Sequence, residues 1–320
     1  MRRRSLLYAL AASLLAGAPS MAQTPDFPNQ LVRIIVPFSA GSVTDGLARI
    51  LADKLPELWG QQVIVDNRPG VPGTASAAKS PADGHTLLLT SNGHALVGSL
   101  NKTASVDPVK DFSGVTQIAS VPFVLVAAPD LPVSDLQELL ALARAKPGTL
   151  NMALPGTGSA ATIASELFRR EAKIELVAVP YKGAPEAHAG VLRGDAHIFF
   201  SAVNIGAELV HTGKVKAIAV SSRMRLPSLL DVPTIAEAGL PAFDYDAWFG
   251  VLVPAGTPRP VIEKVNRDIA SVLQMPDVRT RLERQGIELR TATPDRFDAM
   301  IRNDTARFGT MIAPDNARSN

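Results

Sequence analysis

Short apolar runs rich in β-branched residues alternate along the chain with longer segments whose apolar residues recur at helical spacing. The first unit opens with Val32–Val36, which predicts a buried strand. Phe38–Ser42 then predicts a short loop and Val43–Leu51 a helix with one apolar face. Further strands are expected at 62–66 and 86–90, so this part of the chain has a βαβαβ order, which is typical of a parallel sheet.

A second set of the same kind begins at residue 150. A strand at 150–154, a turn of small residues and a helix at 160–171 are followed by strands at 176–181 and 196–200. Two long apolar strands, 122–127 and 245–253, are candidates for crossings between the two sets. The pattern predicts a bilobed α/β fold of two βαβ-built domains joined by crossing strands, with a cleft between them where small ligands tend to bind.

The length and the crossings suggest domain bounds. We expect domain 1 to contain residues 23–122 and 246–320, and domain 2 to contain residues 123–245. The C-terminal part, 259–308, is expected to be helical, with Val261, Val265, Ile269 and Val272 on one buried face.

The first 22 residues have the pattern of a signal peptide. Arg2, Arg3 and Arg4 precede an apolar run at 6–16, and the small residues Ser20 and Ala22 predict cleavage after Ala22. A transmembrane anchor is the alternative, but the run is shorter than the roughly 20 residues that a span needs. We expect a protein exported to the periplasm, with no membrane insertion after cleavage.

Composition narrows the possible chemistry. The formal charge is +2 and includes those three arginines, so the rest of the chain is close to neutral and gives no reason to expect nucleic acid as a partner. The chain has no cysteine, which excludes disulfides, thiolate metal sites and cysteine nucleophiles.

Two turns of small residues, each between a strand and a helix, are the main candidates for binding. In the first, Ser42 or Thr44 suits the N-cap and Asp45 lies in the first helical turn. The second runs from Pro155 to Ser159. Any α/β protein needs glycine in such loops, but two helix N-termini facing a cleft would hold an anion through backbone N–H groups. Tyr181 ends a strand and is within reach of such a ligand.

Three features of the sequence suggest catalysis, a nucleotide cofactor or a metal, but each motif is incomplete. Gly156–Ala161 matches the loose dinucleotide pattern G-x-G-x-x-A, but no acidic residue ends the next strand. Ser159 lacks the flanking glycines of a nucleophile elbow. The five histidines show no metal-ligand spacing, although His94 follows a strand end that should face the cleft. We therefore expect no cofactor and no metal.

A series of short motifs makes the chain resemble the substrate-binding receptors of tripartite tricarboxylate transporters, often called Bug receptors. The motifs occur in the same order over essentially the whole chain after residue 22, and they are VPFSAG with Thr44-Asp45, VDNRPG at 65–70, DGHTLL at 83–88, Asp111-Phe112, VPYKG at 179–183, VPT at 232–234, EAG at 237–239 and WFG at 248–250. The resemblance implies a type II-like periplasmic-binding-protein fold that closes on a small carboxylate and delivers it to membrane permease subunits.

The resemblance also implies which residues form the pocket. The first turn would hold the ligand's carboxylate and the second turn its other end, partly through water, while Ser91–His94 and Ser201 would complete the pocket. With Tyr181, the candidate ligand-binding residues are Phe38, Ser39, Ala40, Gly41, Ser42, Thr44, Asp45, Ser91, Asn92, His94, Gly156, Thr157, Gly158, Ser159, Tyr181 and Ser201.

Two departures from the family's pattern bear on the ligand. The chain has Gly41-Ser42 where the family often has a glycine pair, and no acidic residue near Ser201. Nothing obvious would pair with an ammonium group, so a dicarboxylate or aromatic carboxylate is favoured over an amino acid. We expect a monomeric receptor without catalytic activity. An exported α/β enzyme acting on a small carboxylic acid or ester is the alternative.

Overall fold

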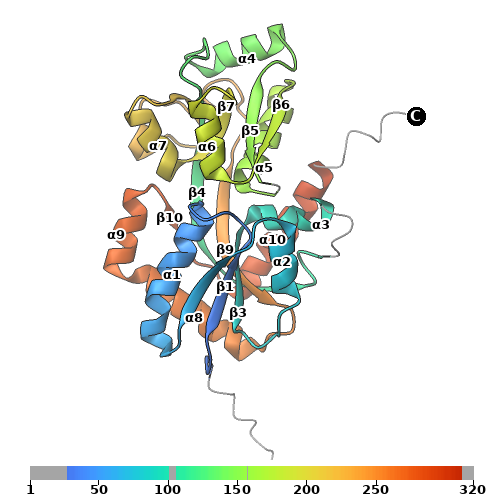
Figure 1. The fold of residues 1–320 in the computed structure, drawn as a ribbon, viewed down its shortest axis with the longest axis vertical. Helices are drawn as coiled ribbons and strands as arrows, with labels where there is room; N and C mark the ends of the chain where they lie inside the picture. Colours follow the sequence, from blue (N-terminus) through green and yellow to red (C-terminus); the bar gives the residue numbers. More distant parts are fainter. Residues whose placement is uncertain (1–26, 101–105, 157, 312–320) are drawn as a thin grey trace, which may run out of the picture.

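The computed structural model describes residues 27–100, 106–156 and 158–311 and shows two lobes stacked along the long axis of the molecule (Figure 1). The helices are α1 (Val43–Trp59), α2 (Val71–Ala78), α3 (Val97–Leu100), α4 (Leu136–Ala145), α5 (Ala160–Ala172), α6 (Ala184–Leu192), α7 (Val203–His211), α8 (Arg259–Gln274), α9 (Pro276–Arg284) and α10 (Pro294–Met311), with 3₁₀ turns η1 (Asn92–Leu96) and η2 (Pro227–Leu229). Within the described ranges, no helix is both long and apolar enough to cross a membrane.

The strands form one mixed sheet in the order β2-β1-β3-β9-β4-β7-β5-β6, with β8 and β10 also paired to β4. They are β1 (Val32–Val36), β2 (Val63–Asn67), β3 (Thr86–Ser91), β4 (Phe112–Ala127), β5 (Asn151–Pro155), β6 (Val177–Tyr181), β7 (Ile198–Ala202), β8 (Lys216–Val220), β9 (Asp246–Pro254) and β10 (Glu288–Leu289). As predicted, β1, β2 and β3 are parallel to one another, and β5 is parallel to β6 and β7.

We call lobe 1 the part built on β1, β2, β3, β9 and the first part of β4, and lobe 2 the part built on β5 to β8 and the end of β4. Successive side chains of a strand point to opposite faces of a sheet. Accordingly Ile34 belongs to the core beside α1 and α8, whereas Ile35 belongs to the core beside α2 and α10. The apolar residues of 32–36 are therefore buried on both faces, while Arg33 in the same strand is partly exposed and pairs with Asp66 at 3.0 Å.

Strand β4 passes from one lobe into the other. Its residues 112–122 pair with β9, and its residues 123–127 pair with β7 and β8. The chain returns just before β9, where the N–H of Tyr245 donates to the carbonyl of Ser221 at 3.0 Å. Strand β9 itself pairs with β3 and β4, so its partners all lie in lobe 1.

Several helix boundaries differ from the sequence prediction for one physical reason. The sequence predicts short helices at 75–79 and 187–192, but helix α2 starts at Val71 and helix α6 at Ala184. Each has a proline in its first turn, where the missing N–H is not needed. The pattern analysis wrongly counted these prolines with the preceding loops.

The cap of α4 is also corrected. Ser134 suits an N-cap by type, but Asp135 occupies that position and accepts from the N–H of Glu138 at 2.8 Å. Ser134 instead donates its N–H and its hydroxyl to the Glu138 carboxylate, both at 2.7 Å. At α1 the predicted cap is correct, since Ser42 accepts from the N–H of Asp45.

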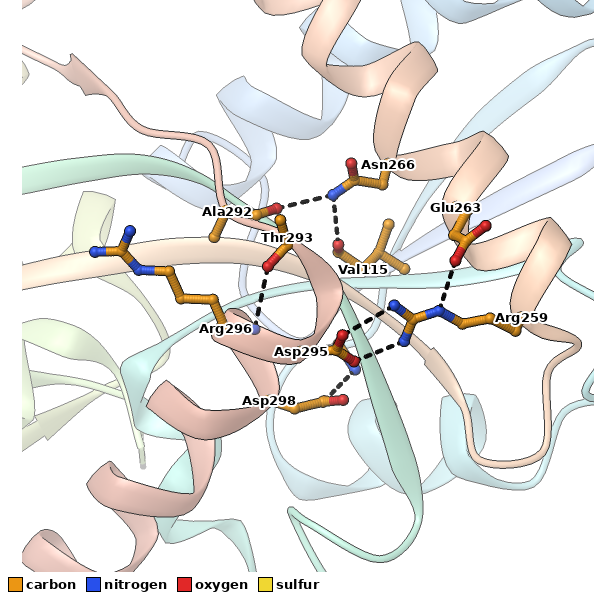
Figure 2. Close-up of polar contacts among 10 residues, drawn as sticks. Val115, Arg259, Glu263, Asn266, Ala292, Thr293, Asp295, Arg296 and Asp298 are labelled. Atoms are coloured by element: carbon orange, nitrogen blue, oxygen red, sulfur yellow. Dashed lines mark hydrogen bonds and ion pairs between the residues drawn. The ribbon is translucent and has the colours of Figure 1, made fainter.

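Polar contacts attach α10 to the rest of lobe 1 (Figure 2). The Arg259 guanidinium donates to both carboxylate oxygens of Asp295, at 2.7 and 3.1 Å. The Asn266 amide donates to the carbonyls of Val115 and Ala292, both at 2.8 Å. These contacts join α8, β4 and the segment before α10, so they fix the outer wall of lobe 1 far from the turns that border the cleft.

Candidate functional site

A cavity lies between the lobes, where both predicted turns meet. It contains about 720 Å³ of empty space, open solvent at its mouth included. Lobe 1 contributes the β1–α1 turn, Ser91 at the end of β3, and Phe249 from β9. Lobe 2 contributes the β5–α5 turn, the start of α6, and the end of β7. The cavity therefore has a wall from each half of the molecule, as the bilobed prediction requires.

The first turn is held in shape by a carboxylate of its own. Asp45, 3% exposed, accepts from the N–H of Gly41, from Nδ2 of Asn67 and from Nε of Arg49, each at 3.0 Å. Burial alone would raise the pKa of Asp45, but these hydrogen bonds outweigh it and hold that pKa below the usual value. Gly41 has φ +80°, a conformation that suits glycine. The turn is thus preorganised, and the Gly41 amide is already used.

Two other amides of this turn remain for a ligand. Val43 and Thr44 begin α1 and line the cavity. The first N–H groups of a helix have no partner inside the helix. The Ser42 hydroxyl accepts from the N–H of Asp45, and the Asp45 carboxylate accepts from the N–H of Gly41. The N–H groups of Val43 and Thr44 have no hydrogen bond to any described residue. The α1 N-terminus therefore offers two donors and the positive end of a helix dipole to the cavity.

The second turn is held by hydroxyl groups. Ser159 is the N-cap of α5 and accepts from the N–H of Thr162 at 3.1 Å. The Thr162 hydroxyl lies 2.9 Å from the Ser159 hydroxyl and donates to the Gly156 carbonyl at 3.0 Å. Ala160 and Ala161, the first helical residues, line the cavity. A second helix N-terminus therefore borders the same space from lobe 2.

Ser91 gives a separate indication that the cavity binds a polar group. It lines the cavity and is 1% exposed, yet its hydroxyl has no hydrogen-bond partner among the described residues. A buried hydroxyl without a partner is unfavourable by about 1–3 kcal/mol. A ligand oxygen in the cavity would satisfy it.

The walls touch each other around the cavity. The Tyr245 hydroxyl donates to the carbonyl of Ala160 at 2.8 Å and accepts from Nδ2 of Asn92 at 3.0 Å. Burial raises the pKa of Tyr245, so it stays a neutral donor. Near the mouth, the Ser39 hydroxyl donates to the carbonyl of Lys182 at 3.2 Å. The lobes are therefore in contact on two sides of the cavity, as in a closed receptor.

His188 and Ser201 form a buried pair in lobe 2. His188 lines the cavity, and its Nε2 lies 2.8 Å from the Ser201 hydroxyl. Burial lowers the pKa of His188, and a hydrogen bond to the Ala184 carbonyl opposes that shift only in part. Ser201 is fully buried and is not among the residues that line the cavity. The pair has the spacing of a nucleophile and base, but its hydroxyl lies behind the histidine, away from any ligand.

His94 lies behind the first turn rather than in the main cavity. Its Nε2 is 3.0 Å from the Pro108 carbonyl, and burial lowers the pKa of His94 to about 4. It borders a small hollow together with Phe38 and Gly158. Within the described ranges, no group of three or more side chains is arranged to hold a metal ion.

The structure brings about half of the predicted site residues to the cavity. Those that line it are Phe38, Ser39, Ser42, Thr44, Ser91, Gly156 and Ser159. Those that do not line it are Ala40, Gly41, Asp45, Asn92, His94, Gly158, Tyr181 and Ser201. Thr157 lies outside the described residues. Tyr181 points elsewhere, since its hydroxyl packs against Gly190 in α6. Several of the second set support the cavity from behind, as Asp45, Asn92 and Ser201 do.

The sequence prediction missed most of the lobe 2 wall. The additional lining residues include Lys182 and His188 and an apolar group made of Phe123, Phe199, Phe200, Ile205 and Phe249. Phe199 and Phe200 precede Ser201, the residue that the family resemblance selected, at the end of the same strand. The rule that ligands bind at the carboxyl ends of strands was sufficient to find them. Nothing in the sequence marked Phe123 or Ile205.

Comparison with known proteins identifies the family. Residues 47–316 match the model of the tripartite tricarboxylate transporter family receptor. The chain belongs to this family. Protein BugT of Bordetella pertussis is 34% identical over 308 residues, which cover 95% of this chain and 94% of BugT. The family resemblance of the sequence motifs is therefore confirmed, and the protein is a periplasmic solute-binding receptor.

Two solved structures of Rhodopseudomonas palustris proteins support the fold of this family member. Rpa4515 with adipate has a TM-score of 0.83 and 32% identity, covering 89% of this chain and 97% of the other. MatC with bound malate has a TM-score of 0.84 and 30% identity, covering 89% of this chain and 99% of the other. The predicted periplasmic-binding-protein fold is confirmed.

Proposed function

We propose that this receptor captures a small carboxylate between its two lobes and delivers it to the permease subunits of a tripartite tricarboxylate transporter. The observation that carries the proposal is a set of unpaired donors in residues that line the cavity. There the buried hydroxyl of Ser91 and the amides of Val43 and Thr44 have no partner among the described residues. Three unpaired donors on the lining of one cavity, two of them at the positive end of a helix dipole, suit an anionic group.

The strength of such a site is sufficient without an arginine. Each hydrogen bond to a charged oxygen contributes roughly 1.5–3 kcal/mol, and each helix dipole about 0.3–1 kcal/mol. Several together reach the approximately −8 kcal/mol that corresponds to micromolar affinity. The relatives whose structures contain adipate and malate show that receptors of this shape accept carboxylates.

The lining residues favour a dicarboxylate or an aromatic carboxylate over an amino acid. No aspartate or glutamate is among the described residues that line the cavity, and Lys182 supplies the only formal charge there. An amino acid would bury its ammonium group without an acidic partner, which is strongly unfavourable. The second turn, with Ala160 and Ala161, offers amides to a second anionic group.

Closure is expected to depend on the ligand. The contacts between Ser39 and Lys182 and between Asn92 and Tyr245 join the two lobes, so we expect them to form when the lobes approach. A ligand that touches both walls shifts the protein toward this state.

We infer that two domains move as units during closure: domain 1, residues 23–122 with 246–320, and domain 2, residues 123–245. We also infer that the receptor is monomeric. Residues 1–22 are inferred to be a signal peptide that is removed after Ala22.

A thermal-shift screen followed by calorimetry tests the function. The purified chain without its first 22 residues is titrated with a panel of mono- and dicarboxylates and amino acids. Stabilisation by a carboxylate is expected, since a ligand that binds the folded state raises the melting temperature by mass action. Ser91→Ala should weaken that binding by about 10-fold, the equivalent of one lost hydrogen bond.

Ser271→Ala is the matched control for Ser91→Ala. Ser271 is exposed on α8 and bonds only to the Arg267 carbonyl, so its change should leave affinity unaltered. If no carboxylate in the panel binds, or if an amino acid binds more tightly than every amine-free acid, the proposed function or its ligand class is wrong.

A further inference from the structure

The cavity has an aromatic wall, and Phe249 of this wall is the cross-strand partner of Ser91. Phe123, Phe199 and Phe249 line it, and each is at most 3% exposed, so their rings are fixed by the surrounding core. Phe200 and Ile205 complete the same wall. These five side chains have no polar atoms, and they come from β4, β7, α7 and β9. The cavity is thus an apolar chamber with the unpaired Ser91 hydroxyl beside one of its aromatic side chains.

His188 belongs to this wall as a neutral ring. A carbonyl only accepts, so the hydrogen bond to the Ala184 carbonyl uses the ring's N–H. Its Nε2 lies 2.8 Å from the Ser201 hydroxyl, within hydrogen-bond distance. Both nitrogens are satisfied inside the protein, so the ring offers the cavity carbon surface rather than a donor. The His188 and Phe199 rings lie edge to face, with centroids 5.0 Å apart.

This arrangement is unsuited to a ligand that is polar along its whole length. A hydroxyl placed against the phenylalanines would lose water without gaining a partner, which weakens binding by about 5- to 100-fold. A flat ring fills such a chamber and gains edge-to-face contacts with fixed aromatic neighbours. A carboxylate on that ring would reach the hydroxyl of Ser91, whose cross-strand partner is Phe249.

We propose that the ligand is a carboxylate carried on an aromatic ring, and that His188 is a specificity-determining residue whose ring is held in place by Ser201. The inference rests on the proposed function, because it adds the chemistry of the ligand's body to a site already argued to bind a carboxylate.

The test compares four acids by calorimetry on the chain without its first 22 residues: benzoate, cyclohexanecarboxylate, adipate and malate. Benzoate should bind roughly 2- to 10-fold more tightly than cyclohexanecarboxylate, which has the same size without the aromatic ring. It should also bind at least about 10-fold more tightly than malate. If adipate or malate binds more tightly than benzoate, or if the two ring acids bind equally, this inference is wrong while the carboxylate receptor stands. If none of the four and no other carboxylate binds, the proposed function fails as well.

Single-residue variants test whether His188 produces the preference for benzoate over cyclohexanecarboxylate. His188→Leu keeps an apolar side chain of similar size, so cyclohexanecarboxylate should still bind, while the preference for benzoate should disappear. His211→Leu makes the same change at an exposed position on α7 and should preserve the preference. Ser201→Ala removes the hydroxyl that fixes the ring and should reduce the preference only in part. Loss of all binding in His188→Leu, with its melting temperature unchanged, would contradict the assigned role.

Histidine-selective NMR provides a readout that a purely structural role would not change. Benzoate should shift the carbon-bound ring protons of His188 through its ring current, and adipate should not. The assignment comes from the signal that is missing in His188→Leu. Equal shifts with both acids, or none with saturating benzoate, would place the aromatic ring elsewhere.

Discussion

The two turns that border the cavity have the same plan and different chemistry. Each follows a parallel strand, contains glycine at positive φ, and ends in a serine that caps a helix. The first turn is fixed by the Asp45 carboxylate, which occupies the Gly41 amide. The second is fixed by uncharged hydroxyls of Ser159 and Thr162. Equivalent positions in two βαβ units can therefore hold the same backbone shape with or without a buried charge.

The difference matters for an anionic ligand. Asp45 is accompanied by Arg49, which lies 3.0 Å away, so the first turn as a whole is nearly neutral despite its carboxylate. The second turn needs no counterion. The contribution of the first turn to the free energy of unfolding should therefore depend on pH and salt. The contribution of the second turn should not.

The largest effect is expected where the second turn meets lobe 1. A Cβ added at Gly93 would lie 1.5 Å from the Gly158 carbonyl oxygen, whereas a Cβ at Gly41 would lie 3.5 Å from Pro185. Gly93→Ala should prevent the lobes from closing and lower ligand affinity by at least about 100-fold, because the ligand then contacts one wall. Calorimetry measures the affinity, and small-angle scattering with saturating ligand should show the more extended form. An unchanged affinity would mean that the lobes close without this contact.

The next effect concerns the charge of the first turn. Asp45→Ala removes the acceptor for three donors and should lower the free energy of unfolding at pH 7 by roughly 2–3 kcal/mol. Because the folded-state pKa of Asp45 is lowered, its ionic contribution is complete above the unfolded pKa of about 3.9 and is lost as pH falls through the folded value. Urea denaturation across this range should show the variant and the parent converging in acid.

Asp53→Ala is the matched control for that experiment. Asp53 is on the same helix, but its side chain is 74% exposed and its nearest cation is 3.9 Å away. Its removal should change stability by less than about 0.5 kcal/mol. A pH-independent loss at Asp45 would show that its packing matters and its charge does not.

A smaller difference should separate the two caps. Ser42→Ala loses one hydrogen bond from the N–H of Asp45 and should lower stability by about 1 kcal/mol. Ser159→Ala also breaks the contact with the Thr162 hydroxyl and should lower it by closer to 2 kcal/mol. Urea denaturation at several salt concentrations measures both. A cost at Ser42 equal to or above that at Ser159 would contradict the hydroxyl network as the support of the second turn.

The smallest effect has the opposite sign. Gly46 lies within α1, one residue after Asp45, and a Cβ there would meet nothing within 4 Å. Gly46→Ala should raise the free energy of unfolding by up to about 1 kcal/mol, since alanine favours the helix. Ligand affinity should be unchanged, so this variant also serves as the glycine control for Gly93→Ala. A loss of stability would indicate crowding around the first turn.

Much of the fold was predictable because it depends on local patterns. The β-branched run at 32–36, the cap at Ser42 and the amphipathic face of α8 each follow from residues within one turn or strand. The same analysis found both turns, since parallel strands gather their C-terminal ends at one edge. Ser91 came from the family resemblance. Trp248 lies in the core, as expected of a large apolar side chain in a strand, and packs on Phe297.

The rest depends on contacts that a local pattern does not encode. Tyr181 ends its strand as the rule requires, but an adjacent glycine, Gly190, leaves room for its ring on the far side. Asp45 was expected to contact the ligand, but its carboxylate instead accepts a hydrogen bond from the N–H of Gly41 within the turn. The aromatic wall is assembled from residues as distant in the sequence as Phe123 and Phe249. Only the crossing of β4 brings them together.

The single long strand β4 has a further consequence for how the molecule comes apart. Its 16 residues supply ladder partners to both lobes, β9 on one side of Phe123 and β7 and β8 on the other. Because both lobes share β4, unfolding of the sheet in one lobe also disrupts the strand that the other lobe needs. Denaturation is therefore expected to follow one cooperative transition, and hinge bending and global unfolding share the same segment of backbone.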